Sequence, residues 1–205
     1  MKKTVWICLL MIILISIIIF FIFQKNMSKD KKNGNNMSSQ EIVDYVLNIS
    51  SYKANVTVNI NSNKNSNKYI LNQEYISPNI NKQEIIEPSN IKGVKIIRDE
   101  NGITVENSRL DLSNIYENYE FIADNCLDLS SFINDYSSSN KSICEDKNNQ
   151  FIMKTESVNG NKYTKNKTLF IDKECLKPVR LEIKDNNKNT TAIILYNEVE
   201  IIKHN

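Results

Sequence analysis

The sequence is poor in the residues that catalysis and metal binding most often use. Its single histidine is His204, and a zinc site built from imidazole ligands needs more than one. It has no glycine-rich phosphate loop, no nucleophile elbow and no Cys-x-x-Cys pair. Carboxylate pairs such as Asp99-Glu100 fall at expected turns, as is typical of solvated charge. We therefore expect no catalytic residue, no cofactor and no metal, and a protein that is not an enzyme.

Glycine, proline and net charge are low as well. Four glycines and three prolines in 205 residues exclude a fibrous or low-complexity chain. Lys2 and Lys3 account for the formal charge of +2, so basic and acidic residues balance in the rest of the chain. A neutral domain lacks the basic surface that nucleic acid requires, and it is drawn only weakly to anionic lipid. We therefore expect no nucleic-acid partner.

Uncharged, mostly apolar residues fill positions 5–23. A helix of this length rises about 28 Å, close to the thickness of the hydrocarbon core of a bilayer. No small-residue cleavage site follows the run, and Cys8 lies too early in it, after bulky Ile7, for lipidation. We therefore predict an uncleaved transmembrane anchor (residues 1–24), a flexible linker (residues 25–37) and an extracytoplasmic domain (residues 38–205) at the cell membrane. The two lysines before the run place the N-terminus in the cytoplasm.

The predicted domain begins with one amphipathic helix. Ser38 and Glu41 have the spacing of a capping box, in which each side chain binds the backbone N–H of the other residue. Apolar residues then follow at helical spacing: Ile42, Val43, Val46, Leu47 and Ile49. We expect this apolar stripe to pack on a sheet.

Alternation of apolar and polar residues predicts strands on both sides of the middle of the chain. The segment "YKANVTVNI" alternates throughout, and the turn "NSNKNSN" leads into a second strand with three apolar residues on one face. Pro78 and Pro88 end the second and third strands, and Asn101-Gly102 marks a hairpin. Four more strands are expected at "QFIMKTESVNG", "TLFIDKE", "PVRLEIKD" and "TTAIILYNEVEI".

The middle of the chain lacks steady alternation. Two sets of residues fit helical faces: Ile115, Tyr119 and Ile122, then Cys126, Leu129, Phe132 and Ile133. We therefore expect one or two helices over residues 112–137. The predicted fold class is α+β, with one strongly curved antiparallel sheet (an incomplete barrel), helices against its concave face, and the transmembrane helix before it.

Three segments carry a resemblance to a known family. They are "EIVDYVLNISSYKANVTVNI", "YISPNINKQEIIEPSN" and "LFIDKECLKPVRLEIKDNNKNTTAIILYNEVEI", and the match spans nearly all of residues 38–202. In order and spacing they resemble the periplasmic lipoprotein carriers LolA and LolB and, more narrowly, the clostridial germination protein GerS and its relatives. GerS is a lipoprotein, whereas no lipidation cysteine is visible here, so the membrane attachment differs.

The resemblance implies two alternative functions. The hydrophobic half-barrel of the carriers holds acyl chains, which implies a carrier or sensor of lipid or lipoprotein. GerS partners the spore-cortex amidase CwlD, which implies a protein that binds and regulates such an amidase during sporulation or germination, in the envelope of the developing spore. The same side chains are candidates for a lipid-binding groove or for a sealed core: Tyr52, Val56, Val58, Tyr69, Leu71, Tyr75, Phe151, Met153, Leu181, Ile183, Ile194 and Tyr196. An open apolar cavity would favour the carrier function.

Three cysteines follow the apolar run, in a region where disulfides can form. Because their number is odd, at most one internal bridge can form and one thiol stays free. Cys126 could pair with Cys144 or with Cys175, and such a bridge would stabilise the fold by about 2–4 kcal/mol. Three reduced cysteines are the alternative.

Overall fold

Alternating residues form long strands that pair in one antiparallel sheet. The computed structural model describes residues 34–61, 65–78, 80–100, 102–107, 112–116, 127–158 and 160–202. Its elements, in chain order, are η1 (Gly34–Asn36), α2 (Ser39–Leu47), β1 (Ser51–Asn61), β2 (Ser66–Ile76), β3 (Ile80–Glu87), β4 (Val94–Asp99), β5 (Gly102–Asn107), β6 (Leu112–Tyr116), α4 (Leu129–Ser138), β7 (Ile143–Lys147), β8 (Gln150–Glu156), β9 (Asn166–Asp172), β10 (Lys177–Lys184) and β11 (Thr190–Ile201).

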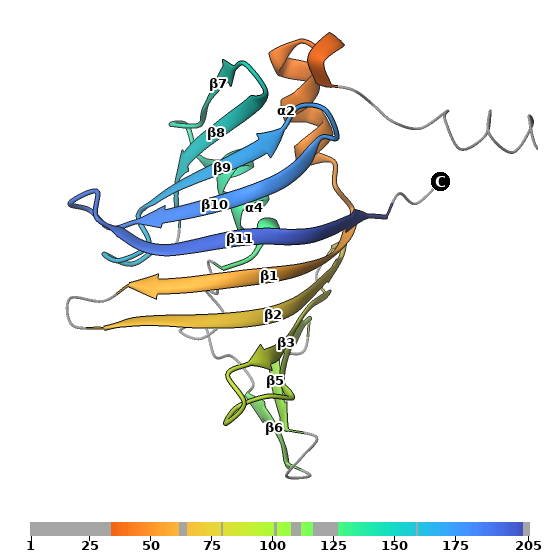
Figure 1. Cartoon of the computed structure of the whole chain (residues 1–205), viewed down its shortest axis with the longest axis vertical. Helices are drawn as coiled ribbons and strands as arrows, with labels where there is room; N and C mark the ends of the chain where they lie inside the picture. Colours follow the sequence, from red (N-terminus) through yellow and green to blue (C-terminus); the bar gives the residue numbers. More distant parts are fainter. Residues whose placement is uncertain are drawn as a thin grey trace, which may run out of the picture. The chain divides into compact units, whose positions relative to one another are not determined.

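The strands follow the order β6-β5-β4-β3-β2-β1-β11-β10-β9-β8-β7 (Figure 1). Every neighbouring pair of strands is antiparallel. The first and last strands of the domain, β1 and β11, meet in the middle of the sheet. The sheet is open, since its two edge strands, β6 and β7, do not pair with each other. The predicted antiparallel sheet with helices on one face is therefore confirmed.

Helix α2 begins as the sequence predicts. The Ser38 hydroxyl accepts a hydrogen bond from the Glu41 backbone N–H at 3.3 Å, and the Glu41 carboxylate accepts one from the Ser38 N–H at 2.8 Å. This capping box satisfies two backbone donors that the first helical turn leaves free. The apolar stripe of the helix is buried at Ile42, Val43 and Val46, and α2 packs on α4 and β7.

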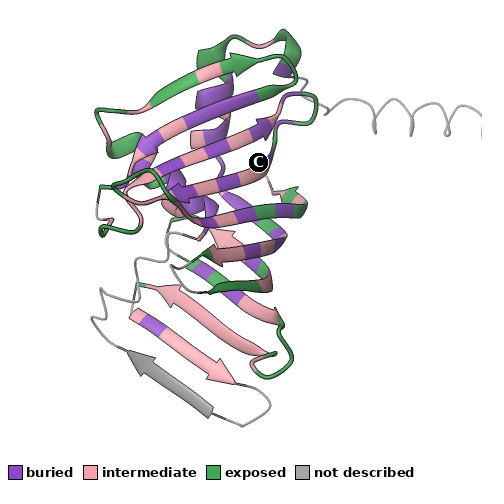
Figure 2. Ribbon diagram, turned by 60° about the vertical axis from the view of Figure 1, so that its left-hand side comes forward, coloured by how far each residue is buried: buried purple, intermediate pink, exposed green. Residues whose placement is uncertain are grey.

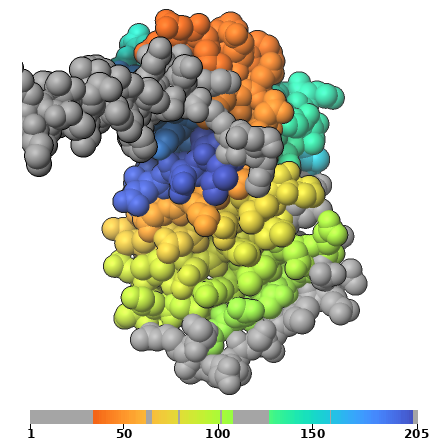
Figure 3. All heavy atoms as spheres, turned by 90° about the vertical axis from the view of Figure 1, so that its right-hand side faces the viewer, coloured from red at the N-terminus to blue at the C-terminus, as the bar shows by residue number. Residues whose placement is uncertain are grey.

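The two faces of the sheet differ. We call the side that α2 and α4 cover the helix-covered face, and the other side the open face. Buried residues alternate with partly exposed ones along β8–β11, whereas β4 and β5 are mostly intermediate in exposure (Figure 2). In Figure 3 the C-terminal end of β11 (blue) borders β1 and β2 (orange to yellow), and β3–β5 (yellow-green to green) continue this surface. The helices thus bury mainly the half of the sheet between β1 and β8.

One prediction about the middle of the chain needs correction. Residues 112–116 are not helical but form β6, which pairs with β5. The later part of the predicted helical region is helical and forms α4 (Leu129–Ser138). A further short edge strand, β7, pairs with β8 ahead of the strands expected after the helical region. Pairing with a neighbouring strand decides the structure of such short segments, because their own patterns are too weak to do so. Residues 117–126 lie outside the described residues.

A residue of the predicted linker contacts the folded domain. Gly34 falls within the expected linker, yet its backbone N–H donates to the Lys173 carbonyl at 2.7 Å. A Cβ added at Gly34 would lie 2.5 Å from Cδ2 of Leu176, so only glycine fits this contact. The predicted anchor and the rest of the linker lie outside the described residues. Within residues 34–202, apart from the gaps, no helix is long and apolar enough to span a bilayer.

Candidate functional site

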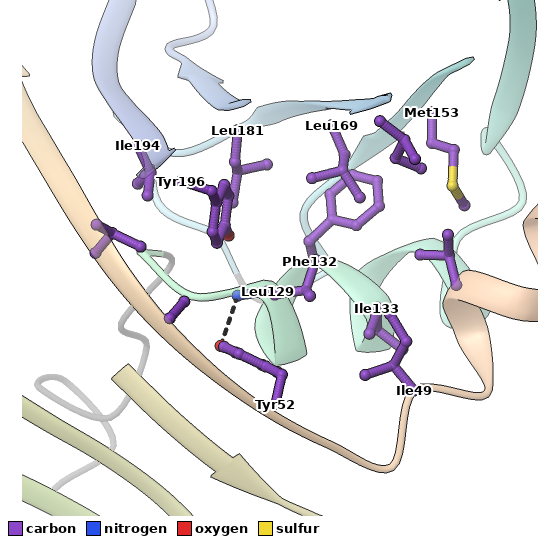
Figure 4. Close-up of a cluster of buried hydrophobic side chains, with 14 of the residues drawn as sticks. Ile49, Tyr52, Leu129, Phe132, Ile133, Met153, Leu169, Leu181, Ile194 and Tyr196 are labelled. Atoms are coloured by element: carbon purple, nitrogen blue, oxygen red, sulfur yellow. Dashed lines mark hydrogen bonds between the residues drawn. The ribbon is translucent and has the colours of Figure 1, made fainter. Parts of the chain in front are cut away.

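The predicted groove-or-core residues all lie in the hydrophobic core of the helix-covered face. Ten of the twelve are buried, and Tyr69 and Tyr75 pack against them partly buried. Helix α4 fills the space in front of the sheet with Leu129, Phe132 and Ile133, of which the first two have no exposed surface. Figure 4 shows Phe132 pointing toward Leu169 of β9. In the described part of the domain these side chains therefore pack against the protein's own helix.

The N-terminal end of α4 is fixed by polar contacts. The Asp128 carboxylate caps the helix, since Oδ1 accepts from the Ser131 N–H at 2.7 Å and from the Ser130 hydroxyl at 2.6 Å. Its other oxygen lies 3.8 Å from the Arg98 guanidinium of β4. The Tyr52 hydroxyl accepts from the Leu129 N–H at 3.2 Å (Figure 4). Burial, and then the nearby Asp128 charge, hold the pKa of Tyr52 well above its usual range.

Amides of β2 and β3 add to this contact. Gln73 donates to the Leu127 carbonyl at 2.8 Å, and Asn81 donates to the Ser130 hydroxyl at 3.1 Å. Both amides are buried on the helix-covered face. This part of the face is therefore polar, and it binds the segment that leads into α4.

The second half of α4 is held by a buried ion pair. Nζ of Lys167 lies 2.6 Å from Oδ2 of Asp135 and donates to the Ser131 hydroxyl at 2.8 Å. The first contact is electrostatic rather than a well-aligned hydrogen bond. The other Asp135 oxygen accepts from the Val158 N–H at 3.0 Å. Sequence reasoning missed this pair, although Lys167 alternates with the core residues Leu169 and Ile171 and so had to face the helix.

A groove of about 740 Å³ crosses the open face from β11 to β5. Strand register places its side chains in two rows across the sheet. The first row consists of Glu200, Lys53, Glu74, Lys82 and Ile97. The second row consists of Glu198, Asn55, Asn72, Glu84, Lys95 and Glu106.

The two rows differ in charge balance. In the first row Glu74 pairs with Lys53 at 3.2 Å and with Lys82 at 3.9 Å. In the second row three glutamates share one lysine, and none of the three forms an ion pair with a described residue. The groove therefore carries a surplus of negative charge along its second row. Alternation predicted that these side chains face solvent, but no signal in the sequence indicates a groove.

The cysteines give no bridge among the described residues. Cys144 and Cys175 are free and exposed, and partial burial raises the pKa of the Cys175 thiol. Cys126 and His204 lie outside the described residues, so the predicted disulfide stays a prediction. In the part of the chain that the structure describes, no group of three or more His, Cys, Asp or Glu side chains could hold a metal ion.

Comparison with known proteins agrees with the fold. A family model described as "Sporulation protein YdcC-like" matches residues 2–204. An uncharacterized conserved protein from Thermus thermophilus is 13% identical, with a TM-score of 0.51 over 82% of this chain and 90% of that chain. A chain in the complex of the CwlD amidase with the GerS lipoprotein from Clostridioides difficile is 20% identical, with a TM-score of 0.50 over 81% of this chain and 93% of that chain.

A LolA superfamily protein from Nitrosomonas europaea is also similar, at 9% identity and a TM-score of 0.44 over 82% of this chain and 96% of that chain. A search of curated protein sequences finds no match. The resemblance inferred from the sequence is confirmed by the family model, and the chain in the GerS complex agrees with it in fold alone.

Proposed function

The chain belongs to the family of YdcC-like sporulation proteins, and from this premise we propose that it is a membrane-anchored accessory protein of spore formation that acts by binding another protein. The observation that carries the proposal is the filled helix-covered face. Phe132, Leu129 and Ile133 occupy the place where a carrier would hold its cargo. What the domain offers to other molecules is therefore its surface.

We assign the partner to the class of cell-wall amidases that act on the spore cortex. The support is the shared fold with a chain in the complex of the CwlD amidase with the GerS lipoprotein. In this scheme the amidase supplies the catalytic groups. It regulates by binding: a protein that binds the active form of an enzyme more tightly shifts the population toward that form.

The alternative, a carrier of lipid or lipoprotein, fits these contacts less well. An acyl chain could enter the helix-covered face only after α4 moved away. That movement would break the hydrogen bond from Leu129 to Tyr52 and would separate Lys167 from Asp135 inside the core. Separating a buried ion pair costs about 3–5 kcal/mol, which a lipid would have to offset.

The proposed location is the outer side of the cell membrane. Residues 5–23 serve as the anchor and stay attached in the mature protein, with Lys2 and Lys3 on the cytoplasmic side. Intact-mass analysis of the protein from membranes tests this part separately. A mature chain that begins near residue 25 would contradict it.

The direct test of the function uses the full-length chain in a non-ionic detergent. We expect it to co-elute in gel filtration with the sporulation amidase of the same organism, and we expect mass spectrometry to find no stoichiometric lipid. The control is a vegetative amidase of the same organism, which should elute alone. Failure to form a complex at micromolar concentrations, together with one bound lipid per chain, would favour the carrier instead.

A further inference from the structure

We infer that the groove on the open face binds an extended, lysine- or arginine-bearing segment of the partner protein. This inference rests on the proposed function, because it names the surface and the chemistry through which the accessory protein binds. Its first support is the shape of the groove. Lining residues come from six neighbouring strands, β11 and β1 to β5, so the groove is about 24 Å long at a strand spacing of about 4.8 Å.

The volume then limits what can enter. Spread over that length, about 740 Å³ corresponds to a cross-section of about 30 Å². An α-helix with its side chains is about 10–12 Å wide, so most of its cross-section would lie outside the groove. An extended chain occupies about 4.8 by 10 Å, so its backbone and the side chains of one face fit while the other face stays in solvent. The groove therefore suits about seven extended residues.

The lining then selects the chemistry. Ile97 is the apolar side chain in the two rows, and the described lining contains no aromatic residue, so an acyl chain or a stacked sugar ring would find few contacts. The surplus of carboxylates favours a cationic occupant over an anionic one. A basic peptide satisfies both conditions.

The spacing of the free carboxylates matches such a peptide. Glu198 and Glu84 lie three strands apart in the second row, which is about 14 Å. Side chains at positions i and i+4 of an extended chain are separated by about the same distance, since each residue advances about 3.4 Å. Glu106 continues the row two strands beyond Glu84. Lysines at alternate positions of one peptide can therefore reach all three glutamates.

The test measures binding of synthetic peptides to the full-length chain in non-ionic detergent. The probe is a peptide of about eight residues in which lysine alternates with serine, and the comparison peptide has glutamate in place of lysine. We expect the lysine peptide to bind and the glutamate peptide not to bind. The double substitution Glu84→Gln/Glu198→Gln should weaken binding of the lysine peptide about fivefold, as expected for two partly exposed charge contacts.

A matched control carries the same chemical change elsewhere. Glu87 and Glu174 are exposed and lie outside the groove, so Glu87→Gln/Glu174→Gln should leave peptide affinity unchanged. Thermal unfolding of both double variants checks that neither change disturbs the fold. Equal loss of affinity in both variants, equal binding of the two peptides, or preferential binding of a neutral oligosaccharide of N-acetylglucosamine would overturn the inference.

The amidase experiment separates this inference from the function on which it rests. If the amidase binds the wild-type chain and Glu84→Gln/Glu198→Gln equally well, the groove is not the docking surface, although the accessory function stands. If the amidase binds neither, the proposed partner is wrong, and the peptide experiment still decides whether the groove takes a basic segment.

Discussion

Replacing Lys167 with methionine removes a charge that has no contact with solvent. The Lys167 side chain is fully buried, and its ammonium group lies between Asp135 and Ser131 of α4. Methionine has a similar length and can fill the same space. The Asp135 carboxylate, however, would keep its charge and lose the cation that compensates it.

The expected loss of stability follows from this burial. Removing one member of a buried ion pair costs about 3–5 kcal/mol. The Asp135 side chain retains 11% of its exposure, so some water can reach it, and we expect a value near the lower limit, about 3 kcal/mol. For a domain of this size that loss lowers the unfolding temperature by about 9 °C, at about 3 °C per kcal/mol.

A second substitution shows whether the charge causes the loss. In Lys167→Met/Asp135→Asn both charges are absent, and the asparagine oxygen can still accept from the Val158 N–H. We expect the double variant to lose about 3 kcal/mol less than the sum of the two single variants, because the contacting residues are coupled. Lys165→Met is the control: its ammonium pairs with Glu156 at 3.3 Å on the surface, and its removal should change stability by about 0–1 kcal/mol.

The measurements are thermal and urea unfolding, followed by circular dichroism, of the wild type, the single variants Lys167→Met and Asp135→Asn, the double variant and the Lys165→Met control. A Lys167→Met chain that melts at the wild-type temperature would show that the pair does not hold α4 on the sheet. Strictly additive losses in the double variant would show that the two side chains act independently.

Phe132→Ala leaves a cavity between α4 and the sheet and should lower the free energy of unfolding in urea by about 3–5 kcal/mol; an unchanged midpoint would mean that this helix does not fill the face. Asp128→Ala removes the cap of α4 and should cost about 2 kcal/mol in the same assay, with Asp128→Asn recovering part of the loss. Burial, and then Cys144, raise the pKa of Tyr136 to about 12, above the usual 10.0. The unfolded chain therefore loses this proton first, so stability should fall as the pH rises from about 10 to 12, which urea midpoints can follow; a flat profile would contradict the shift. Cys144 and Cys175 should both react with maleimide in the folded chain, Cys175 more slowly, and a thiol that reacts only after reduction would instead belong to the predicted disulfide.

The sequence was informative wherever a local pattern and burial agree. The capping box of Ser38 and Glu41 and the alternation along β1 both describe what the structure shows, because each depends on neighbours in the chain. Pro78 and Pro88 follow β2 and β3 closely, as expected for a residue without a backbone donor. Hydrogen bonds between neighbouring strands then join the long strands in one sheet.

Features that depend on distant partners could not be predicted in this way. Strand β6 is decided by its pairing with β5, whereas the pattern of residues 112–137 indicated one or two helices. The groove arises from residues on six strands and is invisible in any one of them. Lys167 is the exception, because its place in an alternating strand already indicated an inward-facing charge that needed a partner.

The pairing of β1 with β11 also determines when the domain can fold. Tyr52 lies opposite Ile201 and Ile60 opposite Ala192, so this central seam joins the two ends of the domain. Strands β2 to β6 can add to β1 as soon as they are synthesised, but the far side of β1 stays without a neighbour until the last strand has been made. Closing so long a loop is slow, and an unpaired strand edge can meanwhile join other chains. A chain that lacks β11 should therefore form two half-sheets with exposed edges, and not a smaller version of the same domain.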